Sequence, residues 1–137
     1  MSRVLAIGDP HEPVCRKGYL SFCQDLYYEW RCDRVVIIGD LADHTAISFH
    51  VQNPEAPGPK NEYKLAKAGI QKWYKAFPKA KVCIGNHDAR PQRVMESVNI
   101  PPAIFLRDFN TIWETPKWKW DHHFIIDDVY YLSLIHI

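Results

Sequence analysis

Three short clusters of metal-binding side-chain types stand out in the sequence. Each cluster follows a short apolar run: Asp9 and His11, then Asp40, then Asn86, His87 and Asp88. Carboxylate, imidazole and amide donors suit Mn²⁺, Fe, Zn²⁺ or Ni²⁺, whereas thiolate-rich sets favour structural zinc. An aspartate can bridge two cations about 3.5–4 Å apart, the separation used in two-metal phosphoester chemistry. The clusters therefore indicate metal-dependent chemistry.

The apolar runs before the clusters predict short buried strands, at 3–9, 34–40 and 81–85. Helical spacing of apolar residues predicts a helix over 17–30, with Tyr19, Phe22, Leu26 and Trp30 on its buried face. Cys23 and Tyr27 are expected to fill the same face. A second helix is predicted over 62–77, after a proline-rich loop at 52–61. Its apolar face holds Ala66, Ile70, Trp73 and Phe77, and its polar face holds Lys64, Lys67, Gln71 and Lys75. A shorter helix is expected over 90–98.

The alternation of strands and helices predicts an α/β fold with a largely parallel sheet, because parallel neighbours need crossover connections. Ligands bind beyond the carboxyl ends of the strands in such sheets. The three polar clusters are therefore expected to converge. Gly8, Gly39 and Gly85 precede the clusters, where a sharp turn with close backbone approach favours a residue without a Cβ.

The motifs resemble those of the calcineurin-like metallophosphoesterase superfamily, whose pattern is D-x-H, GD-x-x-D and GNH[DE]. The matching segments are Asp9-Pro10-His11, then residues 39–43 (GDLAD) and 85–88 (GNHD). The resemblance implies a single domain over 1–137, built as a sandwich of two mixed sheets flanked by helices. Its C-terminal part is expected to be missing from this chain.

The resemblance also implies a role for each matching residue. Asp9 and His11 would bind the first metal, Asp40 would bridge both metals, and Asn86 would bind the second through its side-chain oxygen. His87 would stabilise the transition state or protonate the leaving oxygen. Asp88 would orient His87. The cofactors would be two divalent metals, Mn²⁺ first with Fe, Zn²⁺ or Ni²⁺ as alternatives, activating a hydroxide for in-line attack on a phosphomonoester or phosphodiester.

The second motif departs from that of the phosphoprotein phosphatases of this superfamily. They usually carry GDxVDRG, whereas this chain carries GDLADHT and lacks the arginine expected to hold a protein-borne phosphate. A nucleic acid or nucleotide is therefore a better expected partner than a phosphoprotein, and the pattern is more similar to phage or bacterial members. Asp43 is expected to support the site from behind the ligands. The alternative is a truncated or degenerate domain that binds metal or phosphate without turnover.

The family's two later histidine motifs are absent from this chain. Residues 132–137, LSLIHI, are also the translation of a transposon-end adaptor used in preparing sequencing libraries. Our hypothesis is that these six residues are non-native read-through and that the native frame continues after Tyr131. His136 would then not be a native ligand. The chain as given is expected to be impaired or inactive.

Composition adds weaker constraints. A net charge of +1 disfavours a strongly basic protein designed mainly to bind nucleic acid, although it allows a local basic patch. The four cysteines form no CxxC pair, which favours a reducing compartment. No signal peptide and no run of 18 apolar residues is present, so we expect a cytoplasmic protein, of a bacterium or a phage-infected cell, without a membrane partner.

Several tryptophan and histidine residues could have either functional or structural roles. The tail is expected to alternate a Trp-rich loop with strand-like segments. Its residues Trp113, Trp118 and Trp120 could stack on a base or sugar. The default expectation is that they cover the sheet. His44 could face the site or be a solvated loop residue. His50 is expected on the surface. His122 and His123 are expected to be structural, with one inward and one outward by strand alternation.

Overall fold

The structure, a computed structural model, describes residues 1–133. Its main sheet has four strands in the order β1 (Val4–Ile7), β2 (Arg34–Ile37), β3 (Lys81–Cys83) and β4 (Lys119–Asp121). All three pairings are parallel. The predicted parallel α/β sheet is confirmed in this part of the chain. His136, which we expected not to be a native ligand, lies outside the described residues.

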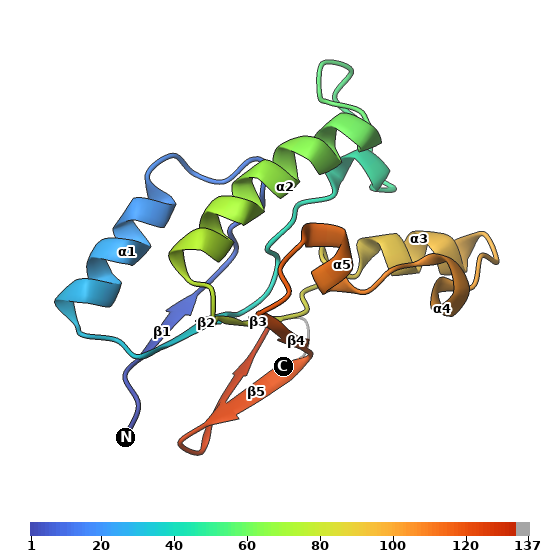
Figure 1. Ribbon diagram of the computed structural model, residues 1–137. Helices are drawn as coiled ribbons and strands as arrows, with labels where there is room; N and C mark the ends of the chain where they lie inside the picture. The colour runs from blue at the N-terminus through green and yellow to red at the C-terminus, as the bar shows by residue number, and fades with distance from the viewer. Residues whose placement is uncertain (134–137) are drawn as a thin grey trace.

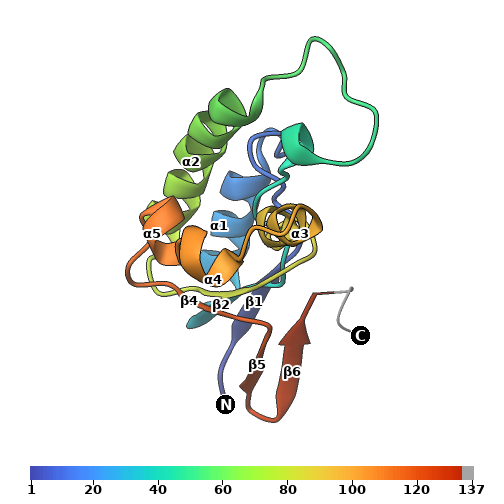
Figure 2. The same ribbon diagram turned by 90° about the vertical axis from the view of Figure 1, so that its right-hand side faces the viewer.

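The second layer is a hairpin of β5 (His123–Ile126) and β6 (Val129–Leu132). The helices lie on one side of the main sheet and the hairpin lies on the other (Figures 1 and 2). The expectation of two mixed sheets is therefore corrected for residues 1–133. The main sheet is wholly parallel and the second is a two-stranded antiparallel pair.

The side chains of the central strands alternate between two apolar clusters. Val35 and Ile37 belong to the larger cluster on the helix side, and Val36 belongs to a smaller one with Cys83 and Ile126 under the hairpin. Successive side chains of a strand point to opposite faces of the sheet. A run that is apolar at every position is therefore what a sheet covered on both faces requires.

The helix α2 (Pro59–Ala76) contributes three buried residues to the core on its side of the sheet. Its buried face holds Ala66, Ile70 and Trp73, as the sequence predicted. The predicted start at residue 62 is wrong, because Pro59 occupies the first turn. Proline suits that position, where its missing N–H would have no partner within the helix. Among residues 1–133, no helix combines the length and apolar character needed to cross a membrane.

The helix α1 (Tyr19–Glu29) confirms part of its predicted buried face and corrects the rest. Phe22 is 56% exposed and Trp30 is 67% exposed, whereas Cys23 is buried and Tyr19 packs against the core. Apolar residues occupy more than one face of this helix. Periodicity therefore identified the helix but could not select the stripe that meets the sheet.

The region after α3 (Arg90–Ser97) holds two helices and a strand that the sequence did not reveal. They are α4 (Pro102–Phe105), α5 (Phe109–Trp113) and β4. The side chain of Asp108 caps α5 by accepting a hydrogen bond from the Thr111 amide at 2.8 Å. Trp113 and Trp118 are 1% and 2% exposed within the helix-side cluster, which confirms their structural role.

The two strand-like segments of the tail are confirmed as the hairpin. His122 and His123 are both exposed. The prediction that one of these histidines points inward and the other outward is therefore wrong. Phe124 and Ile126 are the residues that pack on the sheet. His50 is exposed, as expected.

Replacing Ile70 with alanine should lower the free energy of unfolding by about 2–5 kcal/mol. Ile70 is 0% exposed at the centre of the helix-side cluster, so the substitution leaves a cavity. Urea denaturation measures the change. The matched control is Leu65→Ala in the same helix, where Leu65 is 54% exposed and the expected change is within about 0.5 kcal/mol. Equal effects of both substitutions would contradict the assigned core.

Candidate metal centre

A hollow of about 410 Å³ opens at the carboxyl ends of the first three strands. The five residues predicted from the sequence to act directly on metal or substrate all line it: Asp9, His11, Asp40, Asn86 and His87. Ile38 and Ser133 complete the lining. The convergence follows from parallel strands whose carboxyl ends share one edge of the sheet.

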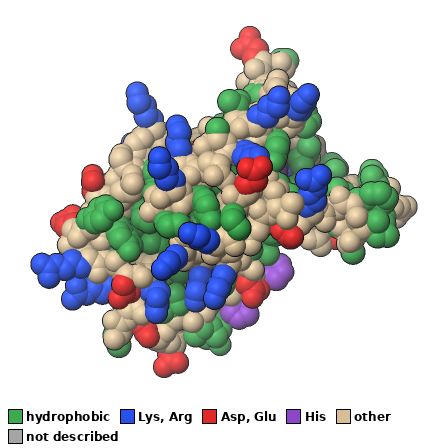
Figure 3. Space-filling view, in the orientation of Figure 1, with side chains coloured by type: hydrophobic (Ala, Val, Ile, Leu, Met, Phe, Trp, Pro, Cys, Tyr) green, Lys and Arg blue, Asp and Glu red, His purple; other side chains and the backbone are tan. Residues whose placement is uncertain are grey.

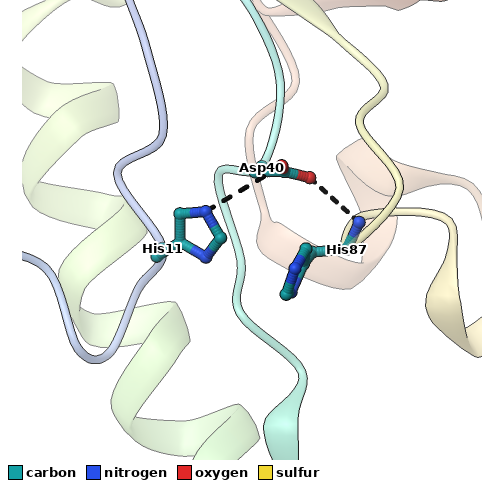
Figure 4. Close-up of side chains that lie close together, drawn as sticks. All are labelled: His11, Asp40 and His87. Atoms are coloured by element: carbon teal, nitrogen blue, oxygen red, sulfur yellow. Dashed lines mark hydrogen bonds and ion pairs between the residues drawn. The ribbon is translucent and has the colours of Figure 1, made fainter. Parts of the chain in front are cut away.

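His11, Asp40 and His87 form the centre of this hollow, with Asp40 between the two histidines (Figure 4). One ligand atom from each lies within 4.8 Å of the others. The Nε2 of His11 is 3.7 Å from Oδ1 of Asp9 and 3.9 Å from Oδ2 of Asp40. Three segments far apart in sequence therefore present nitrogen and oxygen donors to one point.

Asp43 fixes the orientation of both histidines. Its Oδ1 lies 2.8 Å from Nδ1 of His11, and its main-chain carbonyl lies 2.7 Å from Nδ1 of His87. A carbonyl oxygen only accepts, so Nδ1 of His87 carries a proton and Nε2 is the ring nitrogen left to the hollow. A carboxylate on Nδ1 likewise leaves Nε2 of His11 available, the arrangement usual for metal-binding histidines.

The carboxylate of Asp43 is itself held in the ionised form. Burial would raise its pKa, but hydrogen bonds from Thr45 and His11 outweigh burial and lower the pKa below its ordinary value. A carboxylate that stays charged keeps its hold on the His11 ring. The expected supporting role of Asp43 agrees with this geometry.

Asp88 makes a different set of contacts from the one expected. Its carboxylate accepts hydrogen bonds from the amides of Asp40 at 2.8 Å, Gly85 at 2.9 Å and Ala42 at 3.1 Å. Asp88 was expected to orient His87, but the main-chain carbonyl of Asp43 holds the His87 ring instead. Burial raises the pKa of Asp88 to about 7, against the opposing effect of these bonds. Asp88 organises the backbone beneath the site.

Asn86 lies against the same carboxylate as the two histidines. In the amide orientation that satisfies both of its polar atoms, Nδ2 donates to Oδ2 and Oδ1 of Asp40 at 3.1 and 3.2 Å. The amide group therefore lies within reach of a cation held by Asp40. Arg93 holds the main-chain carbonyl of Asn86 at 2.8 Å.

The backbone that carries the ligands is left-handed at three positions. Asp9, His11 and Asp40 have φ values of 51°, 49° and 54°. Residues other than glycine adopt this region uncommonly, although Asp, Asn and His tolerate it best. A hydrogen bond from the His11 amide to the Asp40 carbonyl, at 2.9 Å, joins the two turns. Strained conformations held by their surroundings are typical of functional sites.

Two of the three glycines before the clusters are required by space. A Cβ on Gly85 would lie 2.5 Å from the Asp40 amide nitrogen and against its carboxylate. Gly39 has a φ of 111°, and a Cβ there would lie 2.8 Å from the Ser133 Cβ. Gly8 differs, because an added Cβ would meet only Ile38, at 3.7 Å. The expectation of close approach is therefore corrected for Gly8.

Sequence reasoning missed two residues that brace the site. Arg90 donates through Nη1 to the carbonyls of Asp43 and His44, at 3.1 and 3.0 Å. Its position two residues after GNHD was the available signal. Glu12 is buried and accepts a hydrogen bond from the Trp73 indole at 3.2 Å, which fixes the loop after β1 to α2. Burial raises the pKa of Glu12.

His44 lies behind the hollow and takes no part in its lining. Its ring is half-buried, 5.7 Å from the ring of Trp113, so it matches neither of its two expected locations. Burial, followed by the charge of Arg90, lowers the pKa of His44 from 6.5 to about 4.

The donor set fits a divalent metal. Two imidazole Nε2 atoms with fixed tautomers, two carboxylates and an amide converge on one hollow, and the groups behind them are hydrogen-bonded. Borderline cations such as Mn²⁺, Fe and Zn²⁺ prefer such mixed nitrogen and oxygen ligands. The same donors supply no thiolate for a structural zinc site.

Comparison with known proteins gives one match. The sequence model of a family described as calcineurin-like phosphoesterase matches residues 2–134. No curated protein and no solved structure gives a significant match to this chain.

Gly85→Ala should lower the free energy of unfolding by about 1–3 kcal/mol, the usual range for overpacking. The new methyl group would collide with backbone and carboxylate atoms of Asp40, which Asp88 holds in place. Gly8→Ala is the matched control and should stay within about 0.5 kcal/mol of wild type. Thermal unfolding measures both variants. A neutral Gly85→Ala would disprove the close approach of the two turns.

His44 should make folding sensitive to acid. Because its folded pKa of about 4 lies below the ordinary 6.5, the unfolded chain binds the proton more tightly. The resulting stability is present above about pH 6.5 and is lost as the pH falls toward 4. We expect the free energy of unfolding of wild type to fall by on the order of 2 kcal/mol through this residue, a contribution that His44→Asn lacks. Urea titrations across this range measure it, with exposed His50→Asn as a control that should follow wild type.

Proposed function

Because the chain belongs to the calcineurin-like phosphoesterase family, we propose that its hollow hydrolyses phosphoesters with two divalent metals, Mn²⁺ foremost. The observation that carries the proposal is the orientation of both histidines by Asp43, which leaves their Nε2 atoms to the hollow beside Asp9 and Asp40. The family is one of metal-dependent hydrolases.

The bound metals would act as Lewis acids and activate water for attack on phosphorus. Asp9 and His11 would hold one metal, Asp40 would bridge, and Asn86 would contribute to the second. These are the residues that line the hollow. Their fixed geometry lowers the cost of ordering the site when the metals bind.

His87 would act on the substrate as a proton donor or as a stabiliser of developing charge. Its Nδ1 is held by the Asp43 carbonyl, so Nε2 is the atom that can exchange a proton in the hollow. Asp88 would contribute indirectly, by holding the amides of Asp40 and Gly85. We therefore assign Asp88 a positioning role.

The substrate class that we favour is a nucleotide or nucleic acid. Among the described residues, the lining of the hollow contains no lysine or arginine to hold a protein-borne phosphate. Arg90 lies near the site, but its Nη1 is committed to two carbonyls. Substrate phosphate would then be held chiefly through the metals. Four free cysteines support the proposal of a reducing, cytoplasmic location.

The hydrolase proposal is tested in the protein completed through its native reading frame, because the 137-residue chain alone is expected to be impaired. The assay is hydrolysis of a model diester and a model monoester, the bis-p-nitrophenyl and p-nitrophenyl phosphates. Activity should vanish in EDTA and return with Mn²⁺. Asp40→Asn should lose at least about 100-fold, because the carboxylate that would bridge the two metals is removed. His87→Ala should slow turnover by about 10²–10⁴-fold, the usual contribution of a positioned acid or base.

Asp25→Asn, on the exposed side of α1, is the matched control and should retain full activity. Isothermal titration with Mn²⁺ separates the two functional readings. Metal binding that depends on Asp40 without any turnover would favour a non-catalytic metal-binding or phosphate-binding domain. Turnover that survives in EDTA or in Asp40→Asn would refute the proposed hydrolase.

A further inference from the structure

Three of the four strands of the main sheet begin with a cation. Arg34, Lys81 and Lys119 are the first residues of β2, β3 and β4. Because these strands are parallel, their first residues share one edge of the sheet, opposite the edge that holds the metal site. Lys81 and Lys119 are direct partners in the register. Two like charges therefore lie side by side on neighbouring strands.

The three cations also share the hairpin face of the sheet. Arg34 and Lys81 lie two residues before Val36 and Cys83, which pack under the hairpin, and side chains two residues apart point to the same face. The Lys81 ammonium is 5.4 Å from the ring centroid of Phe124 in the hairpin. Lys119 shares this face through its pairing with Lys81.

These residues line a hollow of about 830 Å³ that is separate from the metal site. Five cations line it: Arg34, Lys79, Lys81, Lys117 and Lys119. Only two carboxylates do so, those of Asp33 and Asp127, and both accept hydrogen bonds from main-chain amides near the N-terminus. Lysine and arginine side chains gather over the part of this face where the strands begin (Figure 3).

The cations of this hollow lack acidic partners in salt bridges. Within residues 1–133, the only salt bridge formed by a lysine or arginine joins Lys67 to Glu114, in another region. Like charges directly opposite in a sheet are destabilising. A concave surface lined by five cations and only two carboxylates carries a net positive charge and is suited to a polyanion, which would release its counterions on binding.

Aromatic rings border the cations. Tyr27 and Tyr28 line the hollow with Phe77, and Tyr28 is 74% exposed. Stacking on aromatic rings together with cationic contacts to the backbone is the usual way to bind single-stranded nucleic acid. We propose that this hollow binds the phosphate backbone of a single-stranded nucleic acid, with the exposed tyrosine available to a base.

The proposed surface is independent of the proposed hydrolysis. The two sites occupy opposite edges of the same parallel sheet, and no residue lines both hollows. Binding at the strand starts therefore requires no metal. It would retain a nucleic acid on the protein whether or not the metal centre acts on that strand.

Fluorescence anisotropy of a labelled single-stranded DNA of about 20 nucleotides, in EDTA, tests the proposal. Wild type should bind at about 50 mM salt and weaken steeply as salt rises. Lys81→Gln/Lys119→Gln should bind at least about tenfold more weakly, and its slope of log affinity against log salt should be shallower by about 1.4. The charge-preserving Lys81→Arg/Lys119→Arg should retain binding.

The matched control is Lys60→Gln/Lys64→Gln on exposed positions of α2, which removes the same charge elsewhere and should stay within about twofold of wild type. Circular dichroism confirms that each variant is folded. Equal weakening by the control pair, or absence of binding by wild type, would overturn the inference. So would equal competition by polyaspartate of matched charge, or by ADP at matched phosphate concentration. Because EDTA excludes hydrolysis, failure here is distinct from failure of the metal centre.

Discussion

A single buried carboxylate organises the site end of this fold. Asp88 is 2% exposed and accepts the amides of Asp40, Ala42 and Gly85, so that the turns after β2 and β3 share one acceptor. Leaving three buried donors unpaired would cost several kcal/mol, by an order-of-magnitude count of about 1–3 kcal/mol each. The turns that carry Asp40, Asn86 and His87 are therefore held by a residue that does not line the hollow.

A second level of organisation acts on side chains. Asp43 directs both imidazoles, and Arg90 holds the carbonyl that pairs with His87. On the far side, Glu12 fixes the loop of His11 to α2. Backbone amides and hydrogen-bonded side chains on four segments thus hold the residues of the hollow in place. Preorganisation of this kind is what a reaction that develops charge on phosphorus requires.

The sequence identified the lining of the hollow because apolar runs predict strands and parallel strands bring their ends together. The sequence could not predict the contacts of Asp88. The amides that it accepts from the turn after β2 lie 46 and 48 residues away, and a sequence motif does not identify main-chain donors. The strand β4 was missed because three residues, two of them charged, carry too little periodicity. The buried placement predicted for Phe22 and Trp30 was wrong, because the sequence of a helix with several apolar faces does not indicate which face meets the sheet.

The shared use of Asp43 links residues that motifs treat as separate. His11 and His87 pack edge to face, with ring centroids 4.7 Å apart, and both depend on the same residue for their tautomer. Interactions of residues in one hydrogen-bonded network are not additive. Positions 11, 43 and 87 therefore form one epistatic unit. A lineage that loses any one of them relaxes selection on the other two, so this site would be expected to decay as a block and not by gradual replacement of single ligands.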